Sequence, residues 1–237
     1  MTTDVKDEIV EGFNTARYTE FDGSDLKIFS ILRDMIQDET DARDLLDIAC
    51  GDGLLGSLML SWRYDVTGCD ISEPALQIAR DRGLKTVRVN LEHYSLPFED
   101  RSFGVIIGSE IIEHIYDTDR FLREVFRVLK DDGVLLLKTP NVLSLGRRIC
   151  YLLGRPVFLD TALRRNQPGH VRYFVRSTLD ALLRDNGFRP VAHDAGFVNF
   201  LQSGRFQSRL LAKLFPNIGG GVIVLSRKYA AQATTRE

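Results

Sequence analysis

The feature that most constrains the fold of this chain is a glycine-rich turn early in the sequence. The run Asp47-Ile48-Ala49-Cys50-Gly51-Asp52-Gly53 lies between two pairs of leucines. This order predicts a buried strand, a tight turn and the start of a helix, with glycines where the backbone approaches a bound molecule. A second acid, Asp70, closes another apolar run 23 positions after Asp47. A glycine turn followed by an acid at this interval is the nucleotide-binding arrangement of a doubly wound sheet, in which the acid accepts hydrogen bonds from ribose.

The ligand of this turn is indicated by Asp47. Gly51, Gly53 and Gly56 have the spacing of the dinucleotide pattern G-x-G-x-x-G, but a carboxylate four positions before the first glycine would repel a pyrophosphate. It suits a ligand with a positively charged amino group, such as S-adenosylmethionine (SAM), which also carries a sulfonium. The segment resembles motif I, D-x-x-x-G-x-G, of class I SAM-dependent methyltransferases. The alternative is an ordinary strand-to-helix turn with incidental glycines.

The resemblance extends over residues 45–140. Asp70-Ile71-Ser72-Glu73-Pro74 is similar to the end of the family's second strand. Residues 87–91 are similar to its third strand, and residues 105–110 to its fourth strand. The segment between them, 96–103, is similar to the loop that borders adenine. It implies an α/β fold with a doubly wound, mostly parallel seven-stranded, Rossmann-like sheet and a lid insertion before the last strands. The residues implied to bind SAM are Asp47, Ala49, Gly51, Gly53, Asp70, Ile71, Asn90, Leu91 and Ser109. Asn90 and Gly104 depart from the family pattern, which has acids there, and we expect SAM binding to survive both changes.

Hydrophobic periodicity predicts the organisation of the rest. We expect an N-terminal helical cap over 1–40 with a helix at 26–36, a methyltransferase domain over 41–228 and a disordered tail over 229–237. Within the domain we expect a helix over 121–130, a strand over 134–138 and a helix over 178–188 with Gly187 as its stop. Strands at 191–194 and 221–226 would form an antiparallel pair by the family resemblance. Segments 141–177 and 196–218 are expected to be lid or acceptor insertions.

Two acids and a histidine follow the expected fourth strand. Glu110, Glu113 and His114 have helical i, i+3, i+4 spacing and would converge on one point, and His170 lies later in a Gly-His-Val-Arg-Tyr-Phe segment. Carboxylates and imidazoles suit Mg²⁺, Mn²⁺ or Zn²⁺. The pattern resembles two metal-dependent groups of O-methyltransferases, the ubiquinone-biosynthesis enzymes and the small-RNA 2′-O-methyltransferases. This resemblance implies Glu110, Glu113, His114 and His170 as metal ligands.

A metal-free alternative stays open for the same residues. His114 or His170 would then act as the general base, because an imidazole titrates near neutral pH. In a third interpretation the glutamate and histidine line the pocket and satisfy backbone groups without catalysing anything.

Charge is distributed unevenly along the chain. Residues 1–140 carry 16 Lys and Arg against 28 Asp and Glu, whereas residues 141–237 carry 15 against 5. The basic half predicts contact with an anion, such as a phosphate, a nucleic acid or an acidic lipid, or else a solvated surface balanced by the acidic half. Segments 144–159 and 200–215 mix apolar and basic residues, which indicates either peripheral membrane contact or lids packed on the sheet.

The remaining composition favours a cytoplasmic protein, peripheral on the inner membrane surface if these segments bind lipid. The three cysteines cannot all pair, no run of 18 apolar residues exists, and the acidic first ten residues do not resemble a secretory signal. The function expected is SAM-dependent O-methylation of a hydroxyl on a small-molecule, glycan-precursor or lipid-linked acceptor, which could be anionic. The alternatives are RNA 2′-O-methylation and a SAM-binding partner protein without catalysis.

Overall fold

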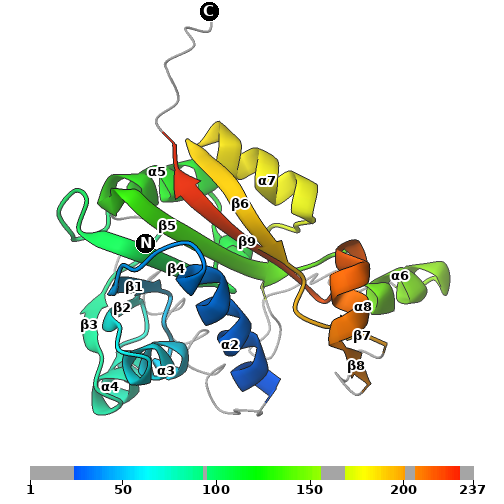
Figure 1. Ribbon diagram of the computed structural model, residues 1–237, viewed down its shortest axis with the longest axis horizontal. Coiled ribbons are helices and arrows are strands. Elements are labelled where there is room, and N and C mark those ends of the chain that lie inside the picture. The colour runs from blue at the N-terminus through cyan, green and yellow to red at the C-terminus, as the bar shows by residue number, and fades with distance from the viewer. Residues whose placement is uncertain (1–23, 93–94, 156–168, 201–205, 230–237) are drawn as a thin grey trace, which may run out of the picture.

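The computed structural model describes residues 24–92, 95–155, 169–200 and 206–229. Strands and helices alternate as far as β5 except between β3 and β4, which no helix separates, because buried parallel strands need helices on both faces. The elements, labelled as in Figure 1, are α2 Ser24–Gln37, β1 Asp44–Ile48, α3 Leu54–Ser61, β2 Asp65–Asp70, α4 Glu73–Asp81, β3 Lys85–Arg88, β4 Phe103–Ser109, η1 Ile112–His114, α5 Thr118–Val128, β5 Leu129–Pro140, α6 Leu145–Leu152, α7 Arg176–Asp185, β6 Phe188–Asp194, β7 Val198–Asn199, β8 Gln207–Ser208, α8 Arg209–Leu214, η2 Pro216–Ile218 and β9 Gly221–Lys228.

Seven strands form one sheet in the order β3-β2-β1-β4-β5-β9-β6. The strands from β3 to β5 pair in parallel, and β9 runs antiparallel to both β5 and β6. The doubly wound, mostly parallel seven-stranded sheet is therefore confirmed, and its last two strands form the expected antiparallel pair. The strand order reverses between β1 and β4. Ligands of such sheets bind outside the carboxyl ends of the strands at this switch point.

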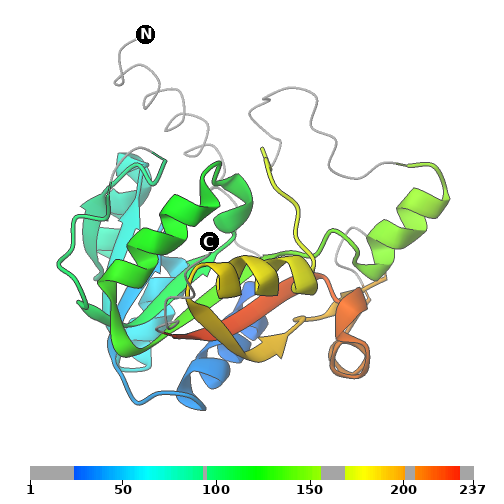
Figure 2. The ribbon, with the colours of Figure 1, turned by 90° about the horizontal axis from the view of Figure 1, so that it is seen from above.

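The two faces of the sheet are covered by different helices. Leu46, Ile106 and Leu135 pack with residues of α5 and α7, whereas the adjacent side chains Leu45, Val105 and Leu136 pack with residues of α2 and α3. Adjacent residues of a strand point to opposite faces, so one apolar run supplies both cores. Figure 2 shows α5 and α7 together on one side of the sheet and α2 on the other.

Several boundaries differ from those expected by a few residues, and two of the differences have a clear structural reason. The helix predicted to reach Lys130 ends at Val128, and β5 begins at Leu129, because Leu129 is fully buried and pairs with Phe103 at the start of β4. β3 occupies residues 85–88 and not 87–91. It ends there because the side chain of Asn90 turns back and accepts a hydrogen bond from the amide of Glu92 (3.0 Å), which starts a turn.

The helix stop at Gly187 is confirmed. α7 ends at Asp185, Gly187 has φ 83°, and its carbonyl accepts a hydrogen bond from the amide of Tyr229. Tyr229 is the only residue of the predicted tail that the structure describes. The rest of the tail and residues 1–23 of the predicted cap lie outside the described residues.

Two insertions extend beyond the carboxyl edge of β5. The first contains α6 and lies between β5 and α7; the second contains β7, β8, α8 and η2 and lies between β6 and β9. They pack on each other through a small core of Ala195, Val198 and Ala212, against which Leu145 and Leu211 lie. In both views α6 and α8 lie at the same end of the molecule (Figures 1 and 2). Among the described residues, no helix combines the length and the apolar character that crossing a bilayer requires.

Candidate active site

The turn between β1 and α3 is built from left-handed backbone conformations. Ala49, Gly51 and Gly53 have φ values of 59°, 55° and 74°, a region that favours glycine. A Cβ added at Gly53 would lie 2.7 Å from the Cβ of Ala79 on α4, so the turn also packs too tightly for a side chain there. The result is a tightly packed turn at the carboxyl end of β1, in which Gly51 and Gly53 are buried.

Asp47 is a buried carboxylate directly before this turn. Its side chain is only 2% exposed, and its Oδ2 has no hydrogen-bond partner. Burial, and then the negative charge of Asp70, raise the pKa of Asp47 to about 7, against a small opposing effect of the Gly56 amide. A cation beside Asp47 would relieve both effects, so this position is complementary to a positively charged group.

Asp70 lies at the end of β2 and is tied to the same turn. Its Oδ2 accepts a hydrogen bond from the amide of Gly51, and its Oδ1 accepts one from the amide of Ser72, both at 2.9 Å. These bonds fix the carboxylate at the carboxyl edge of the sheet. Ile71 and Asn90 follow β2 and β3, and Ser109 closes β4. The structure thus brings all nine SAM-binding residues predicted from the sequence, including Leu91, to the carboxyl ends of β1 to β4.

Gly104, the second departure from the family pattern, has a packing explanation. It lies in β4, where an added Cβ would come within 2.5 Å of the Cβ of Ala42, and its amide donates to the carboxylate of Asp44. An aspartate at this position would not fit beside these neighbours.

The E-x-x-E-H segment does not form a single helical face. Glu110 has φ 59°, and its carboxylate pairs with the ammonium of Lys138 on β5. Burial opposes this ionisation, but Lys138 outweighs it, so the pKa of Glu110 lies below its ordinary value. The 3₁₀ turn η1 begins only after this left-handed residue. The left-handed backbone at Glu110 thus turns its carboxylate toward Lys138, while the carboxylate stays close enough to Glu113 to shift the pKa of that group.

Glu113 lies on η1 and is almost fully buried, with 1% of its surface exposed. Its Oε2 accepts a hydrogen bond from the hydroxyl of Thr139 at 2.9 Å, and its Oε1 has no partner. Burial, and then the charge of Glu110, raise the pKa of Glu113 to about 8. Sequence reasoning missed Thr139, whose only signal is its place at the carboxyl end of the fifth strand.

His114 and His170 meet although 56 positions separate them in the chain. The backbone carbonyl of Glu113 accepts hydrogen bonds from the amides of Val171 and Arg172, which ties the later segment to η1. The two imidazole rings then pack edge to face with centroids 4.9 Å apart. Nδ1 of His114 lies 3.2 Å from the carbonyl oxygen of Gly169. Because a carbonyl only accepts, Nδ1 must carry the proton, and Nε2 carries the lone pair.

These contacts define a three-residue cluster. One ligand atom from each of Glu113, His114 and His170 lies within 4.8 Å of the other two. Two imidazoles and a carboxylate are a donor set that binds divalent transition metals, and the unpartnered Oε1 of Glu113 fits such an ion. The same set can equally accept a proton. Of the four metal ligands predicted from the sequence, the structure groups these three and directs Glu110 to Lys138.

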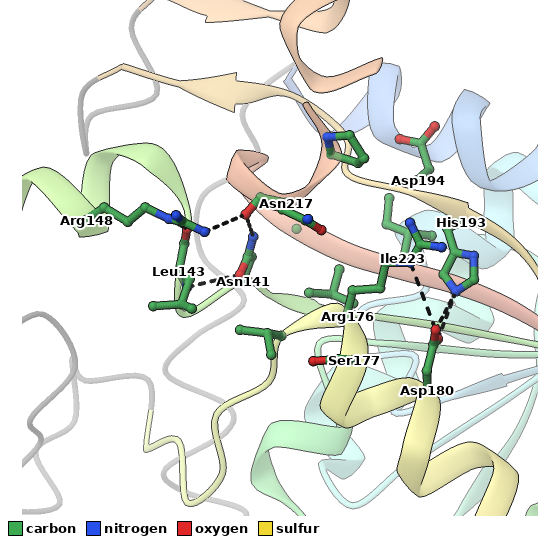
Figure 3. Close-up of a pocket in the computed structure, with 14 residues that line it drawn as sticks. Asn141, Leu143, Arg148, Arg176, Ser177, Asp180, His193, Asp194, Asn217 and Ile223 are labelled. Atoms are coloured by element: carbon green, nitrogen blue, oxygen red, sulfur yellow. Dashed lines mark hydrogen bonds and ion pairs between the residues drawn. The ribbon is translucent and has the colours of Figure 1, made fainter. Parts of the chain in front are cut away.

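A cavity of about 450 Å³ was not foreseen from the sequence, and none of its lining residues belongs to this cluster. It is lined by Asn141 after β5, by the first residues of α7 and by the ends of β6 and β9. Figure 3 shows the carboxylate of Asp180 directed toward both His193 and Arg176. Nε2 of His193 lies 2.8 and 3.0 Å from the two oxygens of Asp180, and Nε of Arg176 lies 3.9 Å from one of them. The carboxyl end of β5 connects the two sites along the chain. Thr139 contacts Glu113 of the cluster, and Asn141, two positions later, lines the cavity.

The fold and this edge define the class of protein: a Rossmann-like domain of the class I SAM-dependent methyltransferase type. The chain belongs to the methyltransferase domain family, whose model matches residues 23–193. It is 32% identical over 182 residues to a probable S-adenosylmethionine-dependent methyltransferase of Mycobacterium tuberculosis (strain CDC 1551), covering 77% of this chain and 58% of that protein.

Two further comparisons agree. A ubiquinone biosynthesis O-methyltransferase of Bordetella avium is 31% identical over 154 residues, covering 62% of this chain and 63% of that protein. The crystal structure of a SAM-dependent methyltransferase of Thermotoga maritima superposes with a TM-score of 0.63 at 19% identity, covering 95% of this chain and 97% of that one. The chain thus spans about three fifths of the length of these curated relatives.

Proposed function

We propose that this protein transfers the methyl group of SAM to a hydroxyl oxygen of a small-molecule, glycan-precursor or lipid-linked acceptor. The observation that carries the proposal is the cluster of Glu113, His114 and His170 at the same sheet edge as the Asp47 turn. A hydroxyl, unlike an amine, becomes a good nucleophile only as it loses its proton, and this cluster can take that proton.

The cofactor-binding roles follow from the edge of β1 to β4. The unpartnered carboxylate of Asp47 would hold the ammonium of SAM, and Asp70 would accept hydrogen bonds from its ribose hydroxyls. The left-handed turn from Ala49 to Gly53 would let the backbone approach the ligand. Asn90 would accept from the adenine amino group, and Ile71, Leu91 and Ser109 would complete the pocket. When bound, SAM supplies an activated methyl group on a positively charged sulfur.

In this proposal a side chain of the protein takes the proton of the acceptor hydroxyl. The carbonyl of Gly169 holds His114 in the tautomer whose Nε2 carries the lone pair, so Nε2 is the base we assign. Nε2 would take the proton of the acceptor oxygen as the methyl group passes from the sulfonium sulfur to that oxygen, and the sulfur would keep the electron pair of the broken carbon–sulfur bond. His170 packs against His114 and would position its ring, and Glu113, one of whose oxygens lies within 4.8 Å of a ring nitrogen of each histidine, would stabilise the imidazolium that results.

Glu113, His114 and His170 would also hold a divalent cation. The fit rests on the unpartnered Oε1 of Glu113 and on the mixed carboxylate and imidazole donors. Such a cation, when bound, would lower the pKa of an acceptor hydroxyl. Of the two roles, we assign that of a histidine base, because the contact with Gly169 already orients His114. Removal of metal ions by a chelator tests whether a cation is needed instead.

The cavity, whose lining includes Asn141 two positions beyond Thr139, would take the body of the acceptor. Its lining combines apolar side chains such as Leu143 and Val222 with the cations Arg148 and Arg176 and the acids Asp180 and Asp194, a mixture that suits a hydroxylated compound.

The experiment that tests this function uses SAM with a labelled methyl group and a cell extract separated into small-molecule, lipid, RNA and protein fractions. We expect label in the small-molecule or lipid fraction, attached through oxygen, and its loss in the Asp47→Ala and His114→Ala variants. The exposed Glu99→Gln variant is the matched control. Label confined to RNA or protein, or the absence of label with active SAM binding, would contradict the proposal.

A further inference from the structure

The exposed apolar side chains of this protein are concentrated at one end. Of the 15 large hydrophobic side chains that are exposed among the described residues, ten lie in segments 143–153 and 200–215. We call the following ten residues the apolar end: Leu143, Ile149, Tyr151, Leu152, Leu153, Phe200, Phe206, Leu210, Leu214 and Phe215. Scattered apolar residues are normal on a protein surface, but a cluster of this kind marks an interaction site.

The helices of the apolar end point their apolar sides outward. α6 has no buried residue, and Leu152 and the adjacent Leu153 are 87% and 67% exposed. On α8, Ala212 is buried, whereas Leu210 and Leu214, one turn apart, are 67% and 61% exposed. Residues four positions apart share a helix face. Each helix therefore presents an apolar stripe away from the protein.

Among the described residues, the exposed charges on and beside these two helices are positive, and Asp194, which contacts α8, pairs with Arg209. Arg148, Arg155 and Lys213 are exposed on or beside α6 and α8. The sequence has no Asp or Glu between Gly133 and Leu159, or between Ala195 and Arg236. Apolar side chains bordered by cations without acids are complementary to a bilayer that carries anionic headgroups.

We propose that α6 and α8 form a surface that docks this protein onto membranes with anionic lipids. The apolar stripes enter the boundary between headgroups and acyl chains, and the cations contact the lipid phosphates. A second copy of this chain is a poorer occupant, because a two-fold contact would place the same uncompensated cations opposite each other. The cavity is lined by Leu143 and Arg148, which adjoin or belong to α6, so docking would place its opening near the lipid.

The docking proposal does not depend on methyl transfer and is tested without it. The full chain is sedimented with vesicles of phosphatidylcholine alone and of phosphatidylcholine mixed with phosphatidylglycerol. We expect the protein to pellet with the anionic vesicles at low salt. High salt should weaken partitioning by about tenfold or more, because salt screens the attraction of exposed cations to the headgroups.

Two double variants and two matched controls locate the surface. Leu152→Ser with Leu153→Ser, and separately Lys213→Glu with Arg155→Glu, should each lower the partition coefficient by about tenfold or more, since each removes one of the two attractions. Ile78→Ser on α4, where Ile78 is 43% exposed, and Arg123→Glu on α5 make the same chemical changes elsewhere and should have no effect. Unchanged thermal midpoints would show that all variants fold.

Several outcomes would overturn the proposal. The protein would fail to pellet with anionic vesicles at low salt, or it would pellet equally well with neutral vesicles. Alternatively, the control variants would lower the partition coefficient as much as the double variants do. If a double variant fails to fold, Leu210→Ser with Leu214→Ser on α8 replaces it. Light scattering that shows a dimer of the wild type, lost in the leucine variants and unaccompanied by vesicle binding, would assign the apolar end to a second copy of this chain.

Discussion

Nε2 of His170 lies 3.9 Å from Oε1 of Glu113, a buried carboxylate oxygen that has no hydrogen-bond partner. This distance is too long for a hydrogen bond. Two residues from distant parts of the chain thus lie side by side, without a hydrogen bond between these two atoms, at the carboxyl edge of the sheet. A buried polar atom left in this way usually has a functional reason. Here both residues adjoin His114, the base that we assign to the acceptor hydroxyl.

Replacement of Glu113 should separate catalysis from cofactor binding. We expect Glu113→Gln to lower kcat by about tenfold or more, because the imidazolium formed during the reaction loses its carboxylate partner. The Kd for SAM should stay within about twofold, since SAM binds through Asp47 and Asp70 in our proposal. Single-turnover kinetics and calorimetry measure the two quantities. A raised Kd with normal kcat would place Glu113 in the cofactor pocket.

The role of His114 can be tested by a variant that keeps the contact of Nδ1 with Gly169 but removes Nε2. In His114→Asn the side-chain amide can still donate to the carbonyl of Gly169, but no atom replaces Nε2. We therefore expect a loss of turnover of about a hundredfold or more with nearly unchanged thermal stability. If His114→Asn retains turnover while His114→Ala does not, the ring only supports the loop.

Chelation distinguishes a histidine base from a cation at the same residues. Because Nε2 of His114 takes the proton in our proposal, we expect turnover to persist in EDTA. Loss of turnover that Mn²⁺ restores, with SAM affinity unchanged, would instead assign Glu113, His114 and His170 to a cation. Calorimetric titration of Mn²⁺ into the wild type and His170→Asn gives a readout that does not depend on activity.

The buried charge of Asp47 should make the cofactor-free protein less stable at high pH. The pKa of this group is raised from 3.8 to about 7. Between these values the folded protein binds more protons than the unfolded chain, so the free energy of unfolding falls as the pH rises through this window. Asp47→Asn should consequently unfold at a higher temperature than the wild type at about pH 8, and the difference should vanish near pH 4.

Asp47 should also make SAM affinity depend on pH. Affinity should rise with pH, whereas the stability of the cofactor-free protein falls. Ionised Asp47 attracts the ammonium, so the wild type should bind SAM more tightly at about pH 7.5 than at about pH 6, and Asp47→Asn should lose this pH dependence. The control is Asp65→Asn, an exposed carboxylate that pairs with Lys85. If the control and Asp47→Asn show the same pH dependence as the wild type, Asp47 does not hold the ammonium.

The sequence predicted those parts of the molecule that local patterns determine. The turn at Gly51 and Gly53, the acid at the end of each of the first two strands and the stop at Gly187 all follow from residue type and spacing. The direction of the Glu110 side chain could not be predicted, because it depends on a left-handed backbone and on Lys138, 28 positions later. The contact of Asp180 with His193 was missed for the same reason, since only the packing of α7 on β6 brings them together.

The most direct test of this account is calorimetric titration of the purified protein with SAM and, separately, with nicotinamide and flavin cofactors. We predict that the wild type binds SAM, that Asp47→Ala weakens this binding by about a hundredfold, and that the other cofactors do not bind. A protein that ignores SAM and binds a nicotinamide or flavin cofactor would contradict the assignment of the Asp47 turn and, with it, the proposed methyl transfer.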